Sequence, residues 1–213
     1  MEAFTVMSAQ SPNTQSVKIV TADPSAIGLF GLAIVTLVAS SQKLEFTTGL
    51  SYVIPWAIFL GAFAQLFAAI QDAKHNNTFG MTAFGAYAFF WFGMASSWLI
   101  KLGVFGPTLA EAVDPKQLGF VFLGYLIFTI FMTIGAVEAN RVLLIIFVLI
   151  DFLFIGLTFD SFGIAPEFFH KLAACAELGI GIVSLYGCGA SVLNAHFGRT
   201  FLPIGAPLGI FKK

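Results

Sequence analysis

Apolar stretches of about 20 residues, separated by short polar turns, recur along this chain and limit what it can fold into. A helix of about 20 apolar residues crosses the hydrocarbon core of a bilayer. A lipid-exposed backbone must also satisfy its own hydrogen bonds, which makes helices the expected spanning element. We therefore predict an all-α integral membrane protein with six transmembrane helices. Their expected ranges are about residues 25–41, 51–70, 78–100, 118–137, 142–158 and 167–193.

The composition supports this fold class and excludes others. Of the 213 residues, 58% are hydrophobic and 10% are charged, whereas a soluble domain has roughly 45–50% apolar and 25% charged residues. The sequence lacks the alternation of period two that a transmembrane barrel requires. Its net charge of -1 excludes a nucleic-acid partner of the usual basic kind.

The chain divides into a polar N-terminal tail (residues 1–22), a transmembrane domain (residues 23–205) and a short C-terminal tail (residues 206–213). Residues 71–77, QDAKHNN, are predicted to form a polar turn, and residues 101–117 are long enough for a short external helix. An even number of spans places both termini on one side, where more of the lysines and arginines fall. We therefore expect a multi-pass plasma-membrane protein with cytoplasmic termini.

The polar residues of the chain do not indicate an enzyme. The sequence has no phosphate-binding loop between a strand and a helix, and its three histidines and two cysteines lack the spacing of metal or haem ligands. Membrane enzymes generally gather several polar groups at one depth, whereas the deep polar residues here are few and scattered. We predict no catalytic residues, no metal and no cofactor.

Three polar side chains within the predicted spans are candidates for a functional role. A carboxylate at bilayer depth costs at least a few kcal/mol, so Asp151 and Glu177 should each face a partner or a wet cavity. Each is a candidate for solute or proton passage, or a structural carboxyl kept neutral by a neighbouring donor. Tyr87 near the middle of a span needs a partner for its hydroxyl, so it should face protein or water rather than lipid.

Six spans with sparse polar groups suit a narrow conduit for a small solute. Aromatic side chains can form a hydrophobic constriction that excludes hydrated ions but passes a small species that sheds its water or proton. A weak carboxylic acid fits, because protonation removes the charge that is costly to move. The residues alone leave open a carboxylate conduit, a channel for a neutral solute such as urea or ammonia, and a structural protein without flux.

Three stretches carry motifs: NNTFGMTAFGAYAFFW at residues 76–91, FGRTFLPIG at 197–205 and ADPSAIGLFGLA at 22–33. They resemble the third-helix, C-terminal and N-terminal signatures of the acetate uptake transporter family, also called succinate-acetate permeases. The last match is partial, because the family's asparagine, second proline and phenylalanine are Asp23, Ala26 and Leu32 here. These departures bear on substrate preference more than on fold.

Because the number of spans between them places them on the same side of the membrane, we also expect residues 76–91 and 194–200 to pack near one pore mouth.

The resemblance implies a transporter or channel for acetate, and for other small carboxylates such as succinate, with proton-linked or channel-like passage through a pore within each subunit. It also implies a homo-oligomer in the lipid bilayer, a hexamer. The family's pore constriction would fall at Leu32, Tyr87 and Ile150. The other positions carried over are Asp23, Pro24 and Gly28 near a mouth, and Asn77, Thr78 and Thr82 beside the path.

Overall fold

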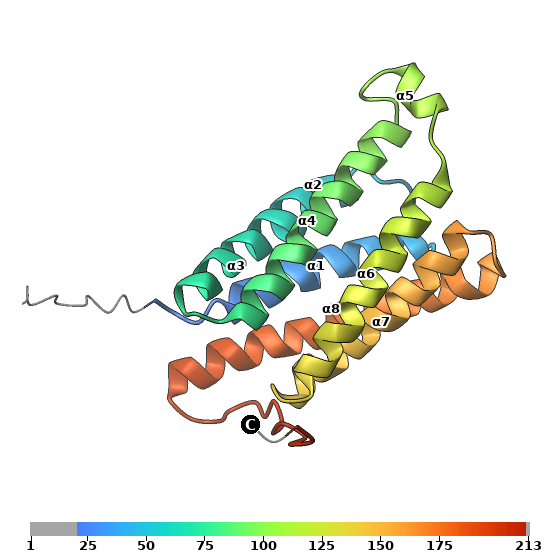
Figure 1. Cartoon of the computed structure of the whole chain (residues 1–213). Helices are drawn as coiled ribbons and strands as arrows, with labels where there is room; N and C mark the ends of the chain where they lie inside the picture. The colour runs from blue at the N-terminus through green and yellow to red at the C-terminus, as the bar shows by residue number, and fades with distance from the viewer. Residues whose placement is uncertain (1–20, 212–213) are drawn as a thin grey trace, which may run out of the picture.

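Six helices that are long and apolar enough to cross a membrane make up most of residues 21–211, the part of the chain that this computed structural model describes (Figure 1). The predicted fold class is confirmed, with helix ends shifted by a few residues. The N-terminal tail lies almost wholly outside the described residues. The helices are α1 (Ser25–Lys43), α2 (Val53–Trp56), η1 (Ala57–Ala64), α3 (Gln65–Lys74), α4 (Thr78–Lys101), α5 (Pro107–Glu111), α6 (Pro115–Ala136), α7 (Arg141–Ser161) and α8 (Pro166–Phe197).

Side-chain caps begin three of the six spans. The Asn77 Oδ1 accepts a hydrogen bond from the Gly80 amide at 3.1 Å, at the start of α4. Asp114 and Asn140 cap α6 and α7 in the same way. A side-chain oxygen at this position satisfies an amide that has no partner inside the helix. The short polar turns therefore set the boundaries of the helices as well as connecting them.

The predicted polar turn at residues 71–77 is partly wrong. Helix α3 continues to Lys74, and the turn is confined to residues 75–77. The reason is that Asp72 is buried on α3 and accepts a hydrogen bond from the Asn77 side chain at 2.9 Å. Helix α5 confirms the predicted external helix in the connection between α4 and α6.

The second span is not a regular α-helix, because its middle third, η1, is a π-helix. Each amide of a π-helix bonds to the carbonyl five residues back, which widens the helix; such segments are rare and often lie at functional sites. Gly61 in η1 packs directly against the Trp91 ring of α4. This π-helical segment was not predicted from the sequence.

The spans pack in a ring. Helix α1 packs against α8, α8 against α7, and α7 against α6, while α3 and η1 pack against both α4 and α1. Helices α4 and α6 meet mainly through their side chains. The ring encloses the space in which the first cavity described below is found.

Gly156 lies where α7 and α8 pack closely. A Cβ atom added there would lie 2.7 Å from the Phe169 carbonyl oxygen and 2.7 Å from the Ala173 amide nitrogen. Small residues let transmembrane helices approach in this way, so that backbone atoms of one helix contact the other.

Replacement of Gly156 by alanine should therefore destabilise the protein, because backbone atoms of α8 cannot move aside independently. Overpacking of this kind costs about 1–3 kcal/mol. Gly124→Ala in α6 is the matched control, since its added Cβ would meet no atom of the described chain within 4 Å. We expect a lower Tm in detergent for Gly156→Ala alone. Equal Tm values for the two variants would contradict this packing.

Candidate functional site

A cavity of about 190 Å³, the first cavity, opens at the end of the ring where α1, α4 and α7 begin. Its mouth is lined by Asp23, Asn77, Asn140 and Ile204, and its inner part by residues near the middle of the spans. A water molecule takes up about 30 Å³ in the liquid. The first cavity therefore has room for a few waters or one small organic solute.

The three residues predicted to form a constriction all line the first cavity. Leu32 of α1, Tyr87 of α4 and Ile150 of α7 are each at most 7% exposed. They come from three different helices near mid-span, so they lie at the inner part of the cavity and not at its mouth. Their role in selecting a solute remains a prediction.

Of the other predicted path residues, Asp23 and Asn77 line the mouth of the first cavity. The remaining four are Pro24, Gly28, Thr78 and Thr82, and they are not among its lining residues. Gly28 packs instead against the ring of Phe84, so its small size serves the contact between α1 and α4. Residues 194–200 do not line the cavity either; from the chain after α8, Ile204 does.

The Tyr87 hydroxyl forms a hydrogen bond of 2.9 Å with Thr129 of α6. This contact confirms the prediction that the hydroxyl faces protein. The Tyr125 hydroxyl of α6 in turn donates a hydrogen bond of 2.9 Å to the Ala86 carbonyl of α4. The Tyr87 ring also stacks on Tyr125 and Phe154, with ring centroids 6.3 and 6.5 Å apart. Aromatic side chains thus close the ring between α4 and α6.

The second span supplies two polar lining residues that the sequence analysis did not assign to the path. Asp72 is 3% exposed and bonds to Asn77 near the mouth. Gln65 is fully buried at mid-span, where its Nε2 donates to the Gly61 carbonyl of η1 at 2.8 Å. Its Oε1 has no partner within residues 21–211. A polar residue in an apolar run was visible in the sequence, but its partner was not.

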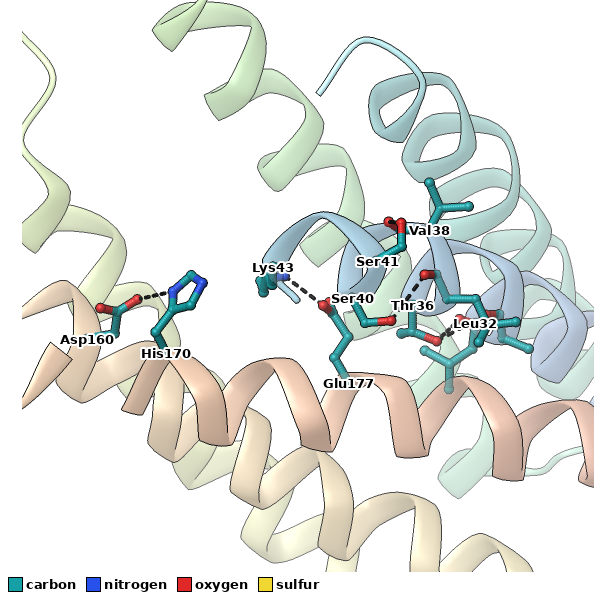
Figure 2. Close-up of polar contacts among 11 residues, drawn as sticks. Leu32, Thr36, Val38, Ser40, Ser41, Lys43, Asp160, His170 and Glu177 are labelled. Atoms are coloured by element: carbon teal, nitrogen blue, oxygen red, sulfur yellow. Dashed lines mark hydrogen bonds and ion pairs between the residues drawn. The ribbon is translucent and has the colours of Figure 1, made fainter. Parts of the chain in front are cut away.

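A second cavity of about 70 Å³ lies toward the opposite ends of the helices. Two of its lining residues form an ion pair, in which the Lys43 Nζ of α1 lies 2.7 Å from the Glu177 Oε2 of α8. Figure 2 shows this pair, and nearer the α7–α8 turn a second contact in which His170 lies 3.1 Å from Asp160. Glu177 thus has the partner that a carboxylate inside a span needs.

Asp151 lies between α6 and α7, where its Oδ2 accepts a hydrogen bond of 2.7 Å from Thr133. It is not among the residues that line either cavity. The two carboxylates that the sequence analysis treated alike therefore have different surroundings. Glu177 lies beside a cavity, and Asp151 lies in a contact between two helices.

The chain that follows α8 folds back over the turn between α6 and α7. The Val142 amide donates to the Ile204 carbonyl at 3.1 Å, and the Leu208 amide donates to the Val137 carbonyl at 2.9 Å. The Phe211 amide then donates to the Glu138 side chain at 2.8 Å. These bonds position Ile204 at the mouth of the first cavity.

Comparison with known proteins gives consistent matches. The sequence profile of the GPR1/FUN34/yaaH family matches residues 6–204. The succinate-acetate/proton symporter SatP of Escherichia coli strain K12 is 34% identical over 186 residues, which cover 86% of this chain and 95% of that protein. The solved structure of the bacterial acetate channel SatP superposes with a TM-score of 0.80 at 32% identity, covering 87% of this chain and all of that one.

A more distant relative comes from yeast. The ammonia transport outward protein 2 of Saccharomyces cerevisiae is 28% identical over 144 residues, which cover 66% of this chain and 51% of that protein. The relatives named here are transporters or a channel. This agrees with the prediction that the chain is not an enzyme.

The ion pair beside the second cavity leads to a test of stability. In Lys43→Met the Glu177 carboxylate, 2% exposed, loses its cation, and breaking a buried pair in this way costs about 3–5 kcal/mol. We expect a clearly lower Tm in detergent. The double variant Lys43→Met, Glu177→Met should recover most of the loss, because apolar residues of similar volume replace buried pairs well. A double variant no more stable than Lys43→Met would contradict this account.

Proposed function

The chain belongs to the GPR1/FUN34/yaaH family, and we propose that it carries acetate across a membrane together with a proton. Other small carboxylates such as succinate are further substrates in this proposal. The observation that supports it best is the first cavity, which leads from a polar mouth to a narrow apolar end at Leu32, Tyr87 and Ile150. The SatP relatives are named for the same substrates.

The barrier between the two cavities is thin. On α4, Tyr87 lines the first cavity and Phe90 the second, so about one helical turn of roughly 5 Å separates them. On α7, Ile150 lines the first cavity and Leu157 the second. These two residues are about two turns, or roughly 10 Å, apart. We therefore propose that movement of a few side chains, without movement of whole helices, joins the cavities. In this proposal Leu32, Tyr87 and Ile150 form the constriction.

We also propose that the protein works as a hexamer in the plasma membrane with its termini in the cytoplasm. Exposed phenylalanines on α6, such as Phe120 and Phe131, offer an apolar surface to lipid or to a second copy. The distribution of lysines and arginines supports the orientation. Native mass spectrometry in detergent measures the subunit number.

A channel for ammonia is the second candidate function. Two carboxylates, Asp23 and Asp72, line the first cavity, and they favour a neutral or cationic solute over an anion. The name of the yeast relative, which refers to outward ammonia transport, supports this candidate function. Ammonia flux that acetate does not inhibit would favour it over the acetate proposal.

Acetate transport is tested with the purified chain in lipid vesicles. We expect uptake of labelled acetate down an imposed gradient at mildly acidic pH, and unlabelled acetate and succinate should compete. Empty vesicles measure the passive leak of acetic acid through the lipid. Uptake no faster than this leak would contradict the proposal.

The constriction is tested with Tyr87→Ala. Loss of the ring should widen the inner end of the first cavity, so labelled propionate and lactate should enter at least severalfold faster relative to acetate. Tyr87→Phe is the matched control, because it removes only the hydroxyl that contacts Thr129; it should keep the size selection. An unchanged ratio of propionate to acetate uptake in Tyr87→Ala would contradict this placement.

A further inference from the structure

We propose that Gln65 recognises the acidic proton of the substrate, by accepting a hydrogen bond at Oε1 from the O–H of the protonated carboxylic acid. This inference rests on the proposed function and adds to it a residue and a substrate form. The proton would then cross the constriction on the substrate itself. One proton moves with each acetate, and no protein group changes its protonation state.

The orientation of the Gln65 amide follows from its neighbour. The Gly61 carbonyl accepts hydrogen bonds and cannot donate them, so the Gln65 atom that faces it at 2.8 Å must be Nε2. The remaining atom of the amide is therefore Oε1, which accepts only. A carboxylate anion has nothing to donate to this oxygen, whereas a protonated acid has one O–H.

Burial makes the unpaired oxygen informative. Gln65 is fully buried and lines the first cavity, while its Oε1 has no partner within residues 21–211. A buried acceptor without a donor costs free energy that an apolar side chain would avoid. An acceptor kept unpaired beside a solute cavity is suited to a donor that arrives with the solute.

The charges around the first cavity favour the same form of the substrate. Its titratable lining groups are Asp23, which precedes α1, Asp72 of α3 and Tyr87 of α4. None of the described residues that line it, including those of α7 and α8, is a lysine, arginine or histidine. Arg141, which packs against Gly205, and His75, near Asp72, lie beside the mouth but outside this lining. An anion inside the cavity would therefore lie beside carboxylates with no cation in the lining, which disfavours it electrostatically.

The π-helix explains how Gln65 is held. Gln65 is the first residue after η1, and its anchor Gly61 lies inside η1. Gly61 also packs against the Trp91 ring, so the segment that carries the anchor is clamped by α4. The side chain is thus fixed by its Nε2, and its Oε1 is left for a ligand.

The experiment compares Gln65→Met with Gln71→Met in lipid vesicles. Gln71 lies six residues further along the same span, also has a buried Oε1 without a described partner, and does not line the first cavity. It therefore controls for the general effect of removing such an oxygen. Labelled acetate uptake is measured at several pH values with the concentration of acetic acid held constant.

For the unaltered chain we expect rates that stay constant across these pH values, because the protonated acid is the species carried. Gln65→Met should lower the rate about threefold to tenfold, as expected for one lost hydrogen bond, without lowering the Tm. Gln71→Met should change the rate less than twofold. Acetamide, which carries N–H donors in place of the O–H, should inhibit the unaltered chain and Gln71→Met more strongly than Gln65→Met.

Three results would overturn the inference. Rates that follow the acetate anion would show that the wrong form was assigned. Normal uptake by Gln65→Met, or equal inhibition of it by acetamide, would show that Gln65 does not meet the substrate, and acetate transport itself would still stand. Absence of acetate uptake by the unaltered chain would instead remove the proposed function, and this inference with it.

Discussion

Inside the hydrocarbon of a bilayer a polar atom finds no water, so the chain itself must supply its partners. This constraint explains the placement of three deep polar groups of the described chain. Glu177 is paired with Lys43, the Tyr87 hydroxyl with Thr129, and Asp151 with Thr133. Each of these contacts joins two helices, so the bonds that satisfy polar atoms also hold the ring together. Gln65 differs from these three, because its bonded partner lies on its own span, as do those of Thr36 and Ser40.

Apolar run length and turn residues predicted the spans, because both depend on local sequence. Asn77, Asp114 and Asn140 stand where polar turns meet apolar runs, and the helices begin there. The partner of Glu177 was not predictable in the same way, since Lys43 is 134 residues away in the chain. The sequence placed Asp72 in a polar turn. Its burial results from the packing of α3, which local sequence does not show. The π-helix has no local signature, so the anchoring of Gln65 also required the structure.

The site residues likewise include some that were predicted correctly to line the cavity and some that were not. The family resemblance predicted that Leu32, Tyr87 and Ile150 form one constriction, and all three line one cavity. It also named Gly28, whose close contact with the Phe84 ring indicates a packing role. The two cavities share α1, α4, α7 and α8, each of which contributes residues to both. A substitution on any of these helices can therefore alter the path from either side, and pathway and packing effects must be separated by measuring Tm beside flux.

The return of the chain over the turn between α6 and α7 bears on how the protein is made. Ile204, bonded to Val142 and lining the mouth, leaves the ribosome after every span has been synthesised. Until that segment docks, the first cavity lacks part of its wall. Insertion of the helices and completion of the mouth are thus separate events in time. A nascent chain held in the membrane before this step would present an unfinished entrance to the solute.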